Sequence, residues 1–156
     1  MNLFLTEISQ NYVLTTAAVS WFIAQLIKFL TALIAERRFS LLLLVSSGGM
    51  PSSHTSFVVA LSAMVGLQQG FDSAIFAVSL VFSSVVMYDA TGVRRHAGKQ
   101  AAVLNMLVEK LNNPNISLEK KLKELLGHTP KQVLAGAVLG LAVAVIAGIS
   151  HGYIPL

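Results

Sequence analysis

The sequence predicts an all-α protein that is embedded in a membrane as a bundle of helices. Of its 156 residues, 54% are hydrophobic and only 12% are charged, which is too apolar for an ordinary soluble domain. The mean hydropathy of +0.71 agrees with this composition. Apolar runs long enough to cross a bilayer recur along the chain. We therefore expect one membrane-embedded domain over residues 1–156, without disulfide or thiolate chemistry because the chain has no cysteine.

Four apolar segments are expected to span the membrane. A span needs roughly 17 to 25 apolar residues to cross ~30 Å of hydrocarbon. The segments of about that length are residues 12–35, 53–69, 72–89 and 130–149, the second being marginal. A shorter run, FSLLLLVSS at residues 39–47, predicts a re-entrant or interfacial segment. Within the last span, the small-residue spacing of GAVLG (136–140) predicts a close helix contact.

A polar insert at about residues 92–128 separates the third and last expected spans. It contains two amphipathic patterns, AAVLNMLVEKL and SLEKKLKELL, and Ser117 can cap the second. The apolar residues that share one helical face are Val103, Leu104, Leu107 and Leu111 in the first pattern, and Leu118, Leu122 and Leu125 in the second. These patterns are typical of surface helices that lie on the membrane or on a partner.

The charges predict how the protein is oriented. If the spans alternate, all eleven basic residues fall on one side, whereas the other side holds Glu7 and Asp72 and no base. Because cytoplasmic flanks collect Lys and Arg, we place the basic side in the cytoplasm and both termini outside the cell membrane. The net charge of +4 is then a one-sided field at a membrane. We expect membrane lipids as partners and no nucleic acid, and we leave open a homo-oligomer.

Three polar clusters are expected to meet on that basic side. PSSH (51–54) begins the second span, YDATGVRRHAGKQ (88–100) ends the third, and GHTPKQV (127–133) begins the last. Two of them are helix N-termini, whose free N–H groups and positive dipole ends favour an anion. The hydroxyl donors are Ser52, Ser53 and Thr55, and the cations suited to phosphate oxygens are Lys28, Arg94 and Arg95. This arrangement predicts a phosphate pocket.

Two histidines suggest chemistry beyond binding. His54 and His128 stand at the starts of two expected spans on the same side. A phosphoryl group between them could be attacked by one ring while the other protonates the leaving oxygen. This is a phosphomonoesterase that works through a phosphohistidine. No metal or other cofactor is expected, because basic residues and helix N-termini can neutralise the phosphate charge.

Each feature also has a purely structural interpretation. PSSH can be an ordinary helix N-cap, and His128 a capping or interfacial residue. The arginines of GVRRHAGK can anchor the chain at a cytoplasmic surface. Lys28 can extend from its span to the interface. His96 is most simply a surface residue, although its position near Arg94 makes it a reserve nucleophile. These interpretations do not explain why all the clusters fall on one side.

The same residues carry a family resemblance. PSSH resembles the second signature of the type 2 phosphatidic acid phosphatase and vanadium haloperoxidase superfamily, usually Pro-Ser-Gly-His, and GHTPKQVLAGAVLG is similar to its third signature. Over almost its whole length the chain looks like the divergent branch called acid phosphatase/vanadium haloperoxidase-related. The resemblance implies that His128 is the nucleophile and His54 the general acid, with Ser52, Ser53 and Lys28 binding phosphate.

The chain also departs from the superfamily pattern. Gln132 stands where an Asp normally orients the nucleophilic ring, and an amide can hold a ring nitrogen without stabilising an imidazolium as a carboxylate does. Asp89 is a candidate to replace that carboxylate, and Arg94 or Arg95 to replace the missing Arg of the third signature. The expected phosphate-binding residues are Lys28, Arg37, Arg38, Ser52, Ser53, Arg94, Arg95 and Lys99.

The sequence thus predicts a membrane-embedded phosphatase that hydrolyses a lipid or isoprenoid phosphate monoester. An apolar tail on the substrate suits a site at the boundary between lipid and water. The alternative, from a different class, is a non-catalytic lipid-phosphate-binding or scaffold protein that keeps the fold. A transporter subunit is disfavoured, because we expect polar residues at one face and none lining the middle of several spans.

Overall fold

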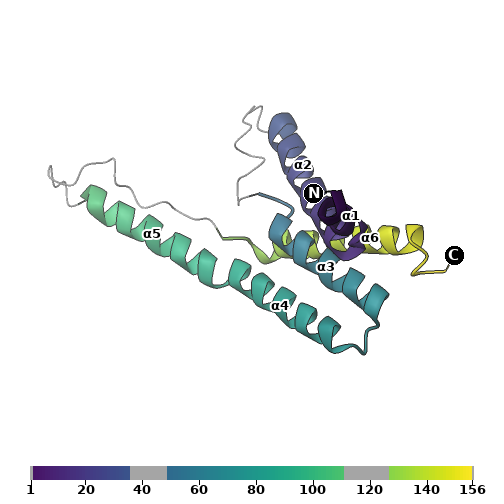
Figure 1. Cartoon of the computed structure of the whole chain (residues 1–156). Coiled ribbons are helices and arrows are strands. Elements are labelled where there is room, and N and C mark those ends of the chain that lie inside the picture. The colour runs from purple at the N-terminus through teal and green to yellow at the C-terminus, as the bar shows by residue number, and fades with distance from the viewer. Residues whose placement is uncertain (1, 36–48, 111–126, 156) are drawn as a thin grey trace.

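The computed structural model describes residues 2–35, 49–110 and 127–155, and these ranges form an all-helical bundle. The described helices are α1 (Asn2–Gln10), α2 (Tyr12–Ala35), α3 (Ser53–Gln69), α4 (Ala74–Thr91), α5 (Val93–Lys110) and α6 (Pro130–Ser150). Helix α3 lies at the centre and contacts α2, α4 and α6 (Figure 1). Helix α5 follows α4 almost in line and extends away from the other helices. The predicted fold class, a helical membrane bundle, is confirmed.

Three stretches of the described chain are long and apolar enough to cross a membrane. They are Tyr12–Ile34 in α2, Ala74–Leu107, which begins in α4 and runs into α5, and Pro130–Ser150 in α6. The remaining expected span corresponds to α3, whose 17 residues give a length of about 25 Å, short of the ~30 Å of hydrocarbon. A fourth span therefore stays a prediction. The expected re-entrant segment (39–47) and the second insert helix (117–126) lie wholly outside the described residues.

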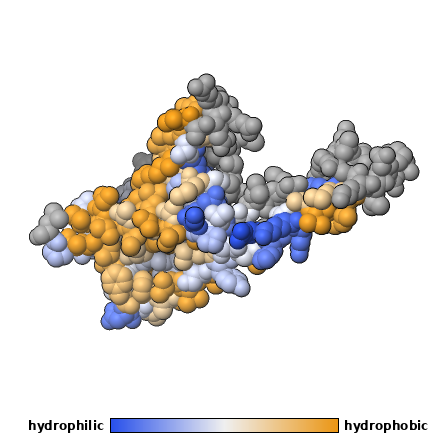
Figure 2. Space-filling model, turned by 180° about the vertical axis from the view of Figure 1, so that it is seen from behind, coloured by the Kyte–Doolittle hydropathy of each residue, from blue (hydrophilic) through white to orange (hydrophobic). Residues whose placement is uncertain are grey.

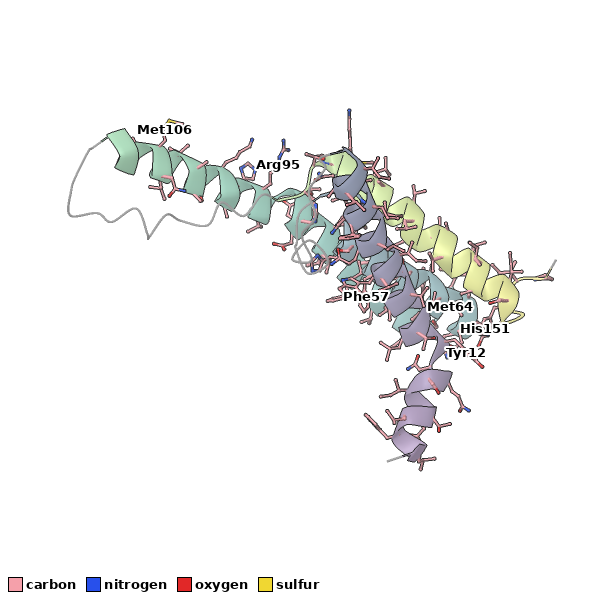
Figure 3. All side chains as sticks on the ribbon, turned by 90° about the horizontal axis from the view of Figure 1, so that it is seen from above. Tyr12, Phe57, Met64, Arg95, Met106 and His151 are labelled. Carbon is pink, nitrogen blue, oxygen red and sulfur yellow. The ribbon has the colours of Figure 1, made fainter. Side chains whose placement is uncertain are left out.

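The two ends of the bundle differ in character. At one end the Tyr12 ring, at the start of α2, stacks on His151 after α6, with ring centroids 3.9 Å apart (Figure 3). At the opposite end, the starts of α3 and α6 are joined by a hydrogen bond from the N–H of Ser52 to the carbonyl of Gln132, 3.0 Å long. The start of α2 and the end of α6 therefore lie together, away from the expected site.

Two glycines allow α3 and α6 to pack closely. A Cβ atom at Gly136 would collide with the carbonyl oxygen of Ser52, and one at Gly140 would come within 2.5 Å of the carbonyl oxygen of Ser56. Since these are backbone atoms of a helix, they cannot move aside as the end of a side chain can. The helix contact predicted from GAVLG is confirmed, and it fixes the register in which α6 lies along α3.

The inner face of α2 carries polar residues and alanines, and its outer face carries large apolar residues. Thr16, Ser20, Gln25 and Lys28 are at most 5% exposed, whereas Phe22 is 60% exposed. This is the reverse of a soluble helix, and it suits a span whose outer face meets lipid. The polar groups then lie where other helices can supply hydrogen-bond partners.

Serine hydroxyls join α3 to its neighbours on both sides. The Oγ atoms of Ser20 and Ser56 are 2.5 Å apart, and those of Ser62 and Ser83 are 2.6 Å apart. The expectation that no polar residue lines the middle of the spans is therefore wrong. Serine hardly lowers the hydropathy of an apolar run, so these residues give no distinct signal in the sequence. Because they pair between helices, they act in helix packing.

Replacing Gly140 with Ala tests the α3–α6 contact. The added methyl group must push α6 away from the Ser56 carbonyl, so we expect the free energy of unfolding to fall by ~1–3 kcal/mol. Unfolding in mixed detergent micelles measures the effect. The control is Ala142→Val, which adds more volume at an exposed position of the same helix. A Gly140→Ala protein as stable as the native one would contradict the packing described.

Candidate functional site

The structure brings the three polar clusters together at one end of the bundle. Ser52 caps the start of α3, Thr129 caps the start of α6, and the Ser52–Gln132 hydrogen bond holds the two helix starts side by side. The N–H of His128 donates to the carbonyl of Ala90 near the end of α4, over 3.0 Å. Hydrogen bonds between backbone groups therefore join segments that are far apart in the sequence.

Lys28 provides a positive charge beside the start of α3. Its side chain is 5% exposed, and its Nζ atom donates to the Oγ of Ser53 over 3.0 Å. Ser52 and Ser53 are fully buried, and the Ser52 Oγ accepts from the N–H and the hydroxyl of Thr55. A buried ammonium, hydroxyls and the N–H groups of a first helical turn are groups that bind phosphate oxygens.

His128 is held by the residues that begin α6. It is 5% exposed, and its Nδ1 atom is 3.4 Å from the Oε1 of Gln132. The same oxygen accepts from the N–H of Thr129 at 2.9 Å, which fixes the side-chain amide with its oxygen toward the ring. Because Oε1 only accepts hydrogen bonds, a neutral His128 ring carries its proton on Nδ1 and its lone pair on Nε2.

His54 and Asp89 lie at the same end of the bundle as His128, but their side chains are less buried than that of His128. His54 lies in the first turn of α3, two residues after the Ser52 cap, and its side chain is exposed. Asp89 is partly buried in the last turn of α4, next to Ala90, whose carbonyl accepts the His128 N–H. The end of α4 thus directs carbonyl oxygens, the negative end of a helix dipole, toward His128.

The start of α5 also reaches this end of the bundle. Gly127 lies against the backbone of Arg95 so closely that any side chain at Gly127 would collide with it. The Arg95 side chain is partly buried, whereas Lys99, one turn further along α5, is exposed. The Arg94 side chain and the whole of Arg37 and Arg38 fall outside the described parts of the chain.

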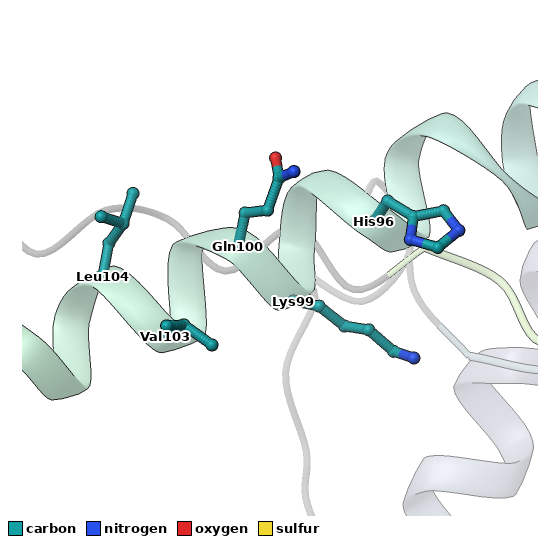
Figure 4. A pocket seen from close by; sticks show the side chains of 5 residues that line it. All are labelled: His96, Lys99, Gln100, Val103 and Leu104. Carbon is teal, nitrogen blue, oxygen red and sulfur yellow. The ribbon is translucent and has the colours of Figure 1, made fainter.

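A shallow pocket runs along α5 beyond this point (Figure 4). The residues that line it are His96, Lys99, Gln100, Val103 and Leu104. None of His54, His128, Ser52 or Ser53 is among them. Lys99, expected among the phosphate-binding residues, thus borders a second surface.

Thr129 and Gln25, at this end of the bundle, were not predicted as site residues from the sequence. Thr129 and Gln132 form a reciprocal capping box, and its signal, a Thr followed three residues later by Gln before an apolar run, was present. Gln25 is 4% exposed on α2, one turn before Lys28. Its signal was a polar amide inside an apolar span, which in membranes contacts other protein groups.

The fold and the site together define the class of this protein. This is an all-helical integral membrane protein in which buried polar residues gather where α3 and α6 begin. The model of the Divergent PAP2 family matches residues 9–143, and the chain belongs to that family. It is also 42% identical over 151 residues to the uncharacterized membrane protein YuiD of Bacillus subtilis (strain 168), covering 90% of this chain and 96% of YuiD. The resemblance found in the sequence is confirmed. No solved structure matches the chain.

Replacing Gln132 with Ala tests how His128 is held. The change removes the acceptor shared by the His128 ring and the Thr129 N–H, so we expect a loss of stability of about 1 kcal/mol. Nitrogen spectra of isotope-labelled histidine in mildly alkaline buffer should show His128 as the Nδ1–H tautomer in the native protein and as a mixture in the variant. Gln68→Ala, at the other end of α3, is the control. An unchanged tautomer would refute the assignment.

Proposed function

We propose that the protein hydrolyses the phosphate monoester of a lipid or isoprenoid through a phosphohistidine on His128. The observation that carries the proposal is one connected group of contacts. Lys28 bonds Ser53, the neighbouring Ser52 bonds Gln132, and Gln132 holds the ring of His128. A cation, two helix starts and an oriented imidazole are what phosphoryl transfer requires from a protein.

In the proposed reaction, Lys28, the serine hydroxyls and the first-turn N–H groups of α3 hold the phosphate oxygens. Nε2 of His128 attacks phosphorus, the bond from phosphorus to the ester oxygen breaks, and His54 gives a proton to the leaving oxygen. Water then attacks the phosphohistidine while His54 removes a proton, which releases inorganic phosphate. The exposed position of His54 suits proton exchange with water.

The positive charge that develops on His128 needs a negative partner. Gln132 is neutral, so it orients the ring without offsetting this charge. Asp89 and the carbonyl end of α4 supply negative charge close to the His128 backbone. We assign the remaining positive charge for the phosphate to Arg95 at the start of α5, and to Arg37, Arg38 and Arg94.

The second candidate is a non-catalytic lipid-phosphate-binding or scaffold protein. The observation that favours it is Gln132 itself, since phosphate binding needs Lys28 and the helix starts but no carboxylate beside His128. The two candidates differ in one product. The enzyme releases inorganic phosphate from a detergent-solubilised lipid phosphate without added metal, and the binding protein releases none.

The two histidines should respond differently to mutation. His128→Ala removes the nucleophile, so we expect no phosphoenzyme and no turnover on any ester. His54→Ala should slow alkyl esters by ~10²–10⁴-fold and nitrophenyl esters much less, because a leaving group that is a weak base needs little help from an acid. Phosphate release and trapping of the phosphoenzyme measure both effects.

His151→Ala is the matched control for this pair, since His151 stacks on Tyr12 at the opposite end of the bundle. It should keep normal turnover. The catalytic proposal fails if His128→Ala also keeps normal turnover, or if the native protein binds lipid phosphate and releases none.

We also propose that the site faces the cytoplasm and that both termini lie outside. The positive-inside rule supports this orientation, because Lys28, Arg95 and Lys131 lie at the site end in the described part of the chain. The chain has no cysteine, so single cysteines report cleanly. Lys99→Cys should resist an impermeant thiol reagent in intact cells, and Asp72→Cys, between α3 and α4, should react. The reverse pattern of labelling would invert the topology.

A further inference from the structure

Helix α5 presents one side that combines positive charge and apolar groups. We call this side, made of His96, Lys99, Gln100, Val103, Leu104 and Leu107, the α5 face. Val103, Leu104 and Leu107 are 54%, 48% and 50% exposed. Gly98 and Asn105, on the opposite side of the helix, are buried. The helix is therefore two-sided, and its exposed side is the one that carries large apolar groups.

No described helix covers the α5 face. Of the described helices, α5 contacts only α4, and Figure 1 shows it leading away from the bundle. Figure 2, seen from behind, shows hydrophilic residues where α5 leaves the bundle and an apolar patch further along α5. Figure 3 likewise shows Arg95 at the bundle end of α5 and Met106, itself 54% exposed, near the far end.

The position of α5 in the chain puts this face at the membrane boundary. Helix α4 is apolar on the outside, with Val78 and Val81 more than 60% exposed, and after Gly92 the chain continues into α5, whose first turns carry Arg94, Arg95 and Lys99. From Val93 to Leu107 a helix rises about 21 Å. If α5 stood straight out of a membrane spanned by α4, its apolar side chains would be in water. If it bends at Gly92, they can lie in the interface.

The charge of α5 indicates which kind of surface its exposed side can bind. The helix sequence contains Arg94, Arg95, Lys99 and Lys110 and a single acid, Glu109. Along the α5 face, Lys99 and His96 come first and Val103, Leu104 and Leu107 follow. Basic residues next to an apolar strip bind a surface that offers anionic headgroups above acyl chains. A protein partner would have to offer negative charge opposite Lys99 and an apolar surface opposite Val103 and Leu104.

We propose that the α5 face is a binding site for the anionic lipid surface of the membrane in which the bundle sits. Lys99 meets the phosphates of the headgroups, and Val103, Leu104 and Leu107 enter the boundary between headgroups and acyl chains. In the structure α5 continues α4 almost in line, so this binding requires a bend at Gly92 that brings α5 along the membrane plane. The inference does not depend on phosphatase activity.

The test uses the full chain with one cysteine, Leu107→Cys, carrying an environment-sensitive fluorophore. The protein is placed in bilayers of brominated phosphatidylcholine, alone or mixed with brominated phosphatidylglycerol. We expect strong quenching in the mixed bilayer, weaker quenching in phosphatidylcholine alone, and release by high salt, which screens exposed charges. Val103→Cys, on the same face, repeats the test if the first variant does not fold.

Charge and position have their own controls. Lys99→Gln should lower the ratio of bound to unbound α5 in the mixed bilayer about fivefold, the effect of one basic residue near an anionic surface. Lys131→Gln, which removes an exposed lysine in the first turn of α6, should leave the quenching unchanged. A fluorophore at Asp72→Cys, in the α3–α4 connection, should show the same quenching in both bilayers.

Three results would overturn the proposal. The first is an unquenched label at Leu107→Cys in the mixed bilayer, and the second is equal quenching in both lipid compositions. The third is a disulfide between Leu107→Cys residues of two copies without quenching, which would make a second copy of the chain the occupant of the α5 face.

Discussion

The contact between the first turns of α3 and α6 is the constraint on which the site depends. The Ser52–Gln132 hydrogen bond joins the two helix starts, and Gly136 lets the α6 backbone reach the carbonyl of Ser52. Two positive helix ends placed side by side repel each other, and the buried Lys28 adds to the repulsion. Close packing can hold such an arrangement, and a bound anion lowers its energy. A phosphate group is therefore a fitting occupant.

The bilayer accounts for the rest of the bundle. Lipid stabilises apolar outer faces and leaves polar groups no partner but other helices. The serine pairs Ser20–Ser56 and Ser62–Ser83 connect α3 to α2 and α4 in this way. A charge such as that of Lys28 costs about 2.5–3.5 kcal/mol at the centre of a span, and less near its end. The Ser53 hydroxyl offsets part of that cost, so the same group stabilises the fold and prepares the site.

The sequence predicts where the helices start, but it does not predict which face of each helix is buried. Ser52 and Thr129 precede apolar runs, and local capping chemistry decides where those helices begin. The central place of α3 has no such signal, because its small and hydroxyl residues give it no distinct polar side. The sequence predicts the third span at 72–89, whereas α4 runs over Ala74–Thr91 and α5 follows at once. Only Gly92 separates the two helices, and one glycine is a weak signal for a boundary.

The two histidines show the same limit of sequence-based prediction within a single helical turn. His128 stands immediately before its cap, so it meets the end of α4 and is buried. His54 stands two residues after its cap, so it lies on the first turn of α3 and is exposed. Both were predictable as residues at helix starts, but burial depends on which neighbouring helix covers each position. That difference supports the separate roles proposed for the two rings. A buried ring oriented by Gln132 suits covalent attack, with the end of α4 offsetting its charge, and an exposed ring suits proton exchange with water.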